Sequence, residues 1–308
     1  MEEHSAPPRS PRRLRARWLG RIAYRDAWAL QQSFAAARAD GTLEEDQLLL
    51  LEHDPVLTLG RNASEAHVLA LPGLLAERGI EVLRVERGGE VTYHGPGQLV
   101  AYPIVALATP GAPSPGRAAR PVGIRDFVEA LEGAMAETCA AAGVTAGPRS
   151  GHPGCWVGAA TPLPRKIGAL GIRVARGVSF HGIALNVTTN LADFDLIDPC
   201  GTPGLRSTSI ARERARAGIP GADAAAPPST ESVAEAAAAF APALARRLGF
   251  ELVGDLVPCS AQGTDGATAA QSATATDGAG ATDGAGATDD ARATDGATAA
   301  RDLAGAFR

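Results

Sequence analysis

The chain has 308 residues, of which 45% are hydrophobic and 20% charged, and its formal net charge at pH 7 is −5. This length allows one large domain or two small ones, and the slight acidic excess argues against a nucleic-acid-binding protein. No run of 18 apolar residues occurs, and the arginine-rich start lacks the apolar core of a secretory signal. We therefore expect a cytoplasmic protein without membrane or nucleic-acid partners.

In chain order, residues 1–16 are rich in proline and arginine and are expected to be disordered. A helix is predicted from Asp26 to Ala39, where apolar residues recur at helical spacing. Apolar runs at 47–51 and 56–59 predict buried strands, and the alternating segment 80–86 predicts a half-buried strand.

The centre of the chain contains the clearest helix pattern. Residues 91–98, VTYHGPGQ, are predicted to form a tight loop, and residues 99–107 a strand. The segment 108–121, rich in proline, glycine and alanine, is expected to be a flexible surface insertion. One apolar stripe along residues 123–143 then predicts an amphipathic helix.

Short strands separated by glycine-rich turns are predicted at 155–157, 166–174 and 178–185. A last helix is predicted at 230–248, and Pro242 is expected to kink or split it. This irregular alternation of helices and strands favours a mixed sheet over a regular series of parallel units.

The C-terminal tail repeats Thr-Asp, mostly every six residues. The aliphatic residue that a calcium-binding β-helix coil requires is absent from the repeat, so disorder is predicted. The expected organisation is one α/β catalytic domain at 17–257, between a disordered N-terminal segment at 1–16 and a disordered tail at 258–308.

The sequence excludes several common types of binding and catalytic site. The glycines of GPGQLV at 95–100 lead into a strand and lack the third glycine of a dinucleotide fingerprint, and no phosphate-binding P-loop occurs. The segment GVSFH at 177–181 has the wrong spacing for a serine nucleophile elbow. The cysteines are widely spaced, without a C-x-x-C pair, and the histidines show no metal-ligand spacing. We expect no metal and no cofactor.

Lys166 is the only lysine among 29 basic residues. It is either a chance survivor on a solvated strand end or a residue that arginine cannot replace. Arginine stays protonated in proteins, whereas a lysine can exchange its proton and its compact ammonium can stabilise a thiolate.

Cys200 differs from the other cysteines because Pro199 and Gly201 flank it in a predicted tight loop, which favours an exposed sulfur. A nucleophilic role stays one of two interpretations. The remaining cysteines have simpler ones: Cys139 and Cys155 lie in apolar segments typical of a core, and Cys259 borders the tail.

Two histidines, His94 and His181, lie in glycine-bounded segments. Each either orients a substrate or satisfies backbone groups, and the residues alone leave both interpretations open. The other histidines lack such settings: His4, His53, His67 and His152.

Four segments resemble a known family, in the same order: RGGEVTYHGPGQLVAYPI at 87–104, RKIGALGIRV at 165–174, SFHGIALNV at 179–187 and DPCG at 198–201. They are similar to the octanoyltransferases of lipoate synthesis, as are AYRDAWALQ near the start and STSI at 207–210. The resemblance implies the α/β catalytic domain shared with biotin and lipoate ligases, a mixed sheet flanked by helices.

The implied reaction moves an octanoyl group from octanoyl-acyl carrier protein to a specific lysine of lipoyl domains, a step of protein lipoylation that needs no ATP. The implied acceptors are the lipoyl domains of 2-oxo acid dehydrogenase subunits and the glycine cleavage H protein. In the family, the cysteine matching Cys200 forms an acyl-thioester, and the lysine matching Lys166 favours its thiolate.

The resemblance also implies three substrate-binding stretches: Arg87, Gly88, Gly89, Glu90, Val91, Thr92, Tyr93 and His94; Ala169, Leu170 and Gly171; and Gly182, Ile183 and Ala184. The chain departs from the family in two places. Ala169 stands where serine is common, so a hydroxyl contact there is in doubt, and the insertion at 108–121 is longer than typical.

Three alternatives stay open. An ATP-dependent lipoate–protein ligase of the same fold requires an adenylate site and no cysteine nucleophile. A non-catalytic module that binds acyl chains or carrier protein requires no reactive thiol. A cysteine hydrolase releases free octanoate without an acceptor.

Overall fold

The computed structural model describes residues 11–108, 122–199, 205–219, 223, 229–254 and 256. The expectations for residues 1–10, for Cys200 and Cys259, for nearly all of the 108–121 insertion and for the tail at 258–308 therefore lie outside the described residues.

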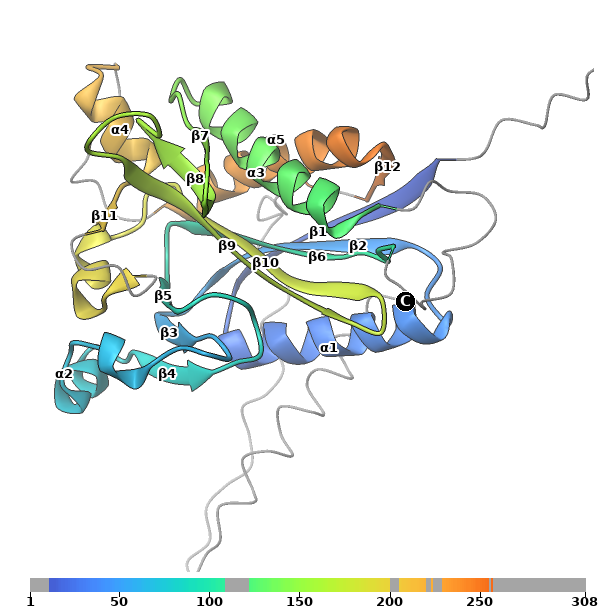
Figure 1. Ribbon diagram of the computed structural model, residues 1–308, viewed down its shortest axis with the longest axis horizontal. Coiled ribbons are helices and arrows are strands. Elements are labelled where there is room, and N and C mark those ends of the chain that lie inside the picture. Colours follow the sequence, from blue (N-terminus) through green and yellow to red (C-terminus); the bar gives the residue numbers. More distant parts are fainter. Residues whose placement is uncertain are drawn as a thin grey trace, which may run out of the picture.

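A large mixed sheet forms the centre of the molecule (Figure 1). Its strand order is β12-β1-β2-β6-β10-β9-β8-β7, and β11 pairs separately with β9. Strand β1 runs parallel to β2 and β12, as β11 does to β9, whereas the remaining pairs are antiparallel. The strands are β1 (Arg12–Ile22), β2 (Asp46–His53), β6 (Gln98–Ile104), β7 (Gly147–Arg149), β8 (His152–Val157), β9 (Arg165–Ala175), β10 (Val178–Asn186), β11 (Arg206–Ser207) and β12 (Phe250–Val253).

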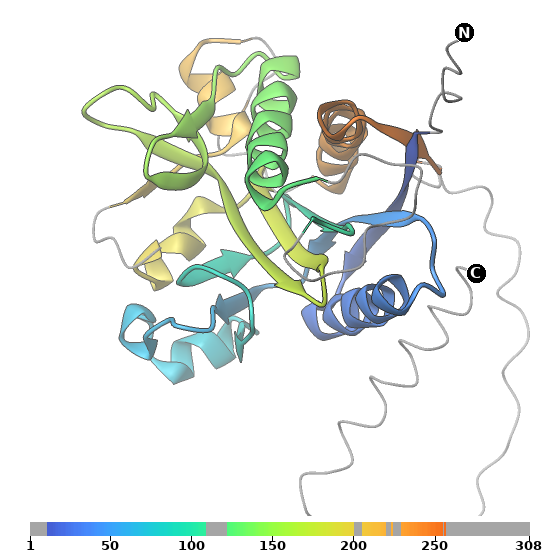
Figure 2. The ribbon, with the colours of Figure 1, turned by 45° about the vertical axis from the view of Figure 1, so that its right-hand side comes forward.

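Helices cover both faces of this sheet (Figures 1 and 2). The helices α3 (Ile124–Ala141) and α5 (Thr230–Leu248) pack together over one face, and α1 (Tyr24–Asp40) covers the other. The leucine run of strand β2 is buried because both faces of this strand are covered. Leu48 and Leu50 pack into the core under α3 and α5, while Leu49 and Leu51 pack into the core under α1. The predicted mixed sheet flanked by helices is confirmed.

A second, three-stranded sheet has the order β4-β3-β5. Its strands are β3 (Val56–Leu59), β4 (Glu81–Arg84) and β5 (Val91–His94), accompanied by α2 (Pro72–Glu77) and two short 3-10 helices, η1 (Glu65–His67) and η2 (Leu191–Leu196). Strand β5 corrects the prediction of a loop at 91–98. Its residues Val91 and Tyr93 are buried because they pack against the small sheet's own core, and the turn comes only after His94.

The first strand begins earlier than the predicted domain boundary. Leu14 and Ala16 are buried in the main core, and the Arg12 guanidinium pairs with the buried Asp46. Residues 12–16 are therefore part of the folded domain, contrary to the expected disorder, because apolar burial between β12 and β2 orders them.

The C-terminal helix also differs from expectation. Pro242 lies inside α5, which continues to Leu248 as one helix, so of the two predicted outcomes, a kink or a split, the split is wrong. Its neighbours Phe240, Ala241, Ala243 and Leu244 are buried in the core, whereas Pro242 itself is exposed. Sequence periodicity also missed the short helix α4 (Ile210–Arg216).

The predicted core cysteines are confirmed as core residues, since Cys139 and Cys155 are fully buried. The side-chain hydrogen bond with Cys155, together with burial, raises the pKa of Cys139 far above that of an ordinary thiol. Within the described part of the chain, no helix is both long and apolar enough to cross a membrane.

Candidate active site

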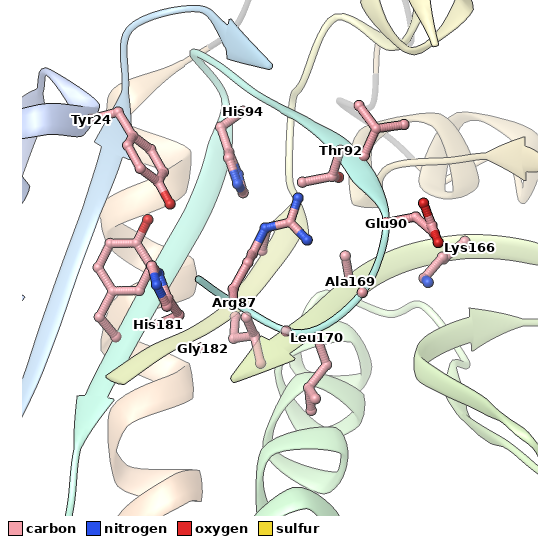
Figure 3. Close-up of a pocket in the computed structure, with 16 residues that line it drawn as sticks. Tyr24, Arg87, Glu90, Thr92, His94, Lys166, Ala169, Leu170, His181 and Gly182 are labelled. Carbon is pink, nitrogen blue, oxygen red and sulfur yellow. The ribbon is translucent and has the colours of Figure 1, made fainter. Parts of the chain in front are cut away.

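A pocket lies where the antiparallel strands β9 and β10 meet the loop before β5 (Figure 3). The pocket opens to solvent, and its empty space, with the open mouth included, is about 500 Å³. Its wall comes from five separate segments: Tyr24; Arg87, Gly89, Glu90, Val91, Thr92 and His94; Tyr102; Lys166, Ala169, Leu170 and Gly171; and His181, Gly182, Ile183 and Ala184.

Apart from Gly88, Tyr93 and Cys200, every residue predicted for the site lies in this wall. The backbone N–H of Gly88 donates to the Ile172 carbonyl at 3.1 Å and so joins the loop to β9. Tyr93 points into the core of the small sheet, where it contacts Phe194 edge to face. Cys200 lies outside the described residues.

Glycine is required where the loop crosses the strands. A Cβ on Gly171 would lie 2.8 Å from the Gly88 carbonyl oxygen, and one on Gly182 would lie 2.0 Å from the Ala101 carbonyl oxygen. Both distances are shorter than ordinary van der Waals contact, so a side chain at either position would push the backbones apart. These glycines set the close approach of β9 and β10 to their neighbours.

Arg87 is a buried positive charge in the pocket wall, with 7% of its surface exposed. Its Nη2 donates to the Thr58 carbonyl at 2.5 Å and to Thr58 Oγ1 at 2.8 Å, and its Nη1 donates to the Gly88 carbonyl at 3.0 Å. Buried charges persist in proteins when such partners replace water. The side chain thereby ties the loop at 87–90 to strand β3.

Aromatic and imidazole rings gather at one end of the pocket. The ring of Tyr24 lies 4.9 Å from that of His53 and stacks on that of His94 at 5.9 Å, centroid to centroid. His53 Nδ1 lies 3.0 Å from the Ile22 carbonyl oxygen and must donate to it, which leaves Nε2 to accept from the Tyr102 hydroxyl at 2.8 Å. These contacts hold the end of β2 against the start of α1.

Burial makes these imidazoles neutral at neutral pH. It lowers the pKa of His53 to about 4. It also lowers the pKa of His94 well below its ordinary value, with help from the neighbouring His53 and Arg87. His94 Nδ1 lies 2.7 Å from the Gln98 side-chain oxygen, while the Gln98 amide nitrogen donates to Asn186, so His94 Nδ1 is the donor.

Sequence reasoning missed three members of this cluster: Tyr24, His53 and Tyr102. His53 follows a buried leucine run and has no flanking glycine, so nothing local distinguishes it. The two tyrosines stand inside AYRDAWALQ and LVAYPI, segments already recognised as similar to the family, and these segments were the available signal.

Lys166 lies at the other end of the pocket, near Glu90 (Figure 3). Its Nζ lies 5.2 Å from the centroid of the Trp156 ring, within the range of a cation–π contact. On the opposite side of β9, Lys166 pairs with Ser207 of β11, and Thr208 N–H donates to the Lys166 carbonyl at 2.9 Å. Ser207 and Thr208, which come after Cys200 in the sequence, therefore lie beside Lys166.

An ion pair secures this region. Arg165 Nε and Nη2 donate to the two carboxylate oxygens of Glu213 at 2.8 and 2.9 Å, which ties β9 to α4. The pair holds the pKa of Glu213 below its usual value against the opposing effect of burial.

Over the described residues, no group of three histidine, cysteine, aspartate or glutamate side chains gathers in a metal-binding arrangement.

Comparison with known proteins gives a consistent result. The model of a family described as the lipoyl protein ligase A/B catalytic domain matches residues 23–225. An octanoyltransferase from Acidobacterium capsulatum is 46% identical over 196 residues, covering 63% of this chain and 78% of that protein. An octanoyltransferase from Myxococcus xanthus is 46% identical over 200 residues, covering 65% of this chain but only 53% of that protein, so the match spans about half of its length.

Solved structures share the fold at low sequence identity. A structure of an archaeal lipoylation system, a bipartite lipoate protein ligase and its E2 lipoyl domain from Thermoplasma acidophilum, matches with a TM-score of 0.56 at 15% identity over 80% of this chain and 86% of that one. Lipoate-protein ligase A bound with ATP matches with a TM-score of 0.53 at 16% identity over 80% and 89%. These similarities confirm the predicted lipoate-ligase type of fold.

Proposed function

The chain belongs to the lipoyl protein ligase A/B catalytic domain family, and on that premise we propose that it is an octanoyltransferase that acylates lipoyl domains in protein lipoylation. The observation that carries the proposal is the pocket, which joins three separate family segments around one space with Lys166 at one end. The curated relatives named octanoyltransferase support the same activity.

The proposed donor is octanoyl-acyl carrier protein, and the proposed nucleophile is Cys200. The Cys200 thiolate attacks the thioester carbonyl carbon, the bond to the carrier sulfur breaks, and Lys166 gives a proton to the departing carrier thiolate. The product is octanoyl-Cys200. Exchange of one thioester for another is nearly isoenergetic, which is why the step needs no ATP.

In the second step, the ε-amine of a specific lysine in the lipoyl domain attacks the octanoyl-Cys200 carbonyl. An amide bond forms, the carbon–sulfur bond breaks, and Lys166 accepts the proton that the amine loses. The position of Lys166 supports this double role, because β11 brings the chain after Cys200 alongside it. We propose lipoyl domains of 2-oxo acid dehydrogenase subunits and the glycine cleavage H protein as acceptors.

The acyl chain would occupy the pocket between its two ends. Ala169 and Ala184, on the same strand faces as Gly171 and Gly182, supply apolar wall along this path. Burial of a CH₂ group contributes about 0.8 kcal/mol, so an octanoyl tail gains roughly 5 kcal/mol of binding free energy from the wall.

Intact-protein mass spectrometry after incubation with octanoyl-acyl carrier protein, without ATP, tests the proposal. Wild type should gain one octanoyl group that hydroxylamine removes, and Cys200→Ser should gain none. Cys259→Ser is the matched control and should acylate like wild type. Absence of an adduct on wild type, or a strict requirement for ATP, would refute the proposal in favour of the ligase or binding-module alternatives.

A further inference from the structure

His181 is a buried polar side chain without a hydrogen bond to its ring. Only 1% of its surface is exposed, and neither Nδ1 nor Nε2 has a hydrogen-bond partner among the described residues. A Glu86 carboxylate oxygen lies 4.0 Å from Nε2, beyond hydrogen-bonding distance. Leaving a buried polar group unpaired costs free energy. The imidazole in the pocket wall can therefore gain stability from a ligand that hydrogen-bonds to its ring nitrogens.

The backbone of His181 is held in an unusual conformation that maintains this placement. Its φ is +57°, in the left-handed region that non-glycine residues seldom adopt. The Gln31 side-chain oxygen accepts its backbone N–H at 2.7 Å from helix α1. Such strain persists where surrounding contacts over-determine it, and it clusters at ligand sites.

The imidazole faces the polar end of the pocket. Its ring lies edge to face with Tyr102, 6.3 Å between centroids, and Figure 3 shows it beside Tyr24 at the end opposite Lys166. Burial, opposed by Glu86 and assisted by the nearby Arg87, lowers the pKa of His181 to about 4. At neutral pH the ring is therefore neutral, with one nitrogen as donor and the other as acceptor.

The distance along the strand from Lys166 to His181 exceeds the length of a medium-chain acyl group by about the reach of the two side chains. His181 pairs with Ile172, six residues beyond Lys166 on β9, and six residues of strand extend about 20 Å. An extended eight-carbon acyl chain spans about 9 Å at roughly 1.25 Å per bond, which leaves about 11 Å for the lysine and histidine side chains. An acyl chain that begins at the end of the Lys166 side chain would therefore extend to the neighbourhood of the imidazole.

We propose that the inner end of the pocket is a polar subsite, centred on His181, for a hydrogen-bonding group carried near the far end of a medium-chain acyl group. The assignment rests on the proposed function, because it takes the acyl carbonyl to lie beside Lys166. The ligands it favours are acyl chains with a hydroxyl at about the eighth carbon. The same imidazole disfavours a purely aliphatic extension, which would bury it without a partner.

Two neutral amides of equal heavy-atom count test the subsite without any acyl transfer: 8-hydroxy-N-methyloctanamide and N-methylnonanamide. The first compound ends in a hydroxyl group, and the second ends in a methyl group in its place. Calorimetric titration of wild type should show at least about tenfold tighter binding of the hydroxylated amide, the scale of one buried hydrogen bond. Equal binding, or tighter binding of the nonanamide, overturns the proposal and requires no variant.

Substitutions assign the effect to the imidazole. His181→Leu should lose or reverse the preference, whereas His181→Asn, which keeps a donor and an acceptor and tolerates positive φ, should retain its direction. His152→Leu changes an exposed histidine outside the pocket wall and should keep the wild-type ratio. A persistent preference in His181→Leu overturns the assignment.

The octanoyl adduct reports the proposed function separately. An enzyme that forms the adduct but shows no preference between the amides refutes the subsite alone. An enzyme that shows the preference but forms no adduct refutes acyl transfer and leaves the subsite standing.

Discussion

Replacing Arg87 by methionine tests whether this buried guanidinium holds the pocket loop in place. Methionine keeps an unbranched apolar stem of similar reach, but it removes the donors that bind the Thr58 carbonyl and hydroxyl and the Gly88 carbonyl. The Thr58 groups lie in a fully buried residue. Each buried polar group left without a partner costs about 1–3 kcal/mol, so the free energy of unfolding should fall by about 2–4 kcal/mol.

Thermal and urea unfolding measure this loss. At about 2–4 °C per kcal/mol for a domain of this size, the melting temperature should fall by roughly 5–15 °C. The control is Arg25→Met, which removes an exposed ion pair with Glu81 and should change stability by less than about 1 kcal/mol. If Arg87→Met unfolds at the wild-type temperature, or no differently from the control, Arg87 does not secure the loop.

Three further predictions concern chemistry, packing and pH. Lys166→Arg should fold normally but slow acylation of the enzyme by about 100-fold or more, since arginine cannot exchange its proton; a wild-type rate in rapid-quench mass spectrometry would exclude the proton-transfer role. Gly171→Ala places a Cβ 2.8 Å from the Gly88 oxygen and should weaken acyl-amide binding by about tenfold, whereas Gly147→Ala, with open space around it, should not; equal affinities of these variants in calorimetry would contradict the packing argument. Because burial lowers the pKa of His53 to about 4 from 6.5, its stabilising effect is complete above pH 6.5 and is lost as pH falls toward 4. Urea unfolding of wild type should therefore show a declining free energy from pH 7 to pH 4.5, with a shallower decline in His53→Asn, and parallel slopes would reject the assignment.

Local patterns in the sequence predicted much of the fold. The helices at α1, α3 and α5 and most strands of the main sheet lie within a few residues of their expected positions, because one apolar stripe or one buried run defines each of them. The prediction failed where burial comes from distant partners. Strand β1 carries five arginines among its eleven residues, and only pairing between β2 and β12 explains its order.

The sequence by itself determined which chemical groups are available to the site. Four sequence segments identified the family, and predicted residues from three of them make up most of the pocket wall. These signals are local, since glycine reports a close backbone approach wherever its partner comes from.

Only the tertiary structure decided the other end of the pocket. Tyr24, His53, Tyr102 and His181 come from a helix and three strands that are far apart in the chain, and no local pattern shows that they lie together. Their neutral state and the unpaired ring of His181 follow from burial, which depends on every element packed around them. Burial is a property of the assembled sheet and helices, so only the folded chain shows it.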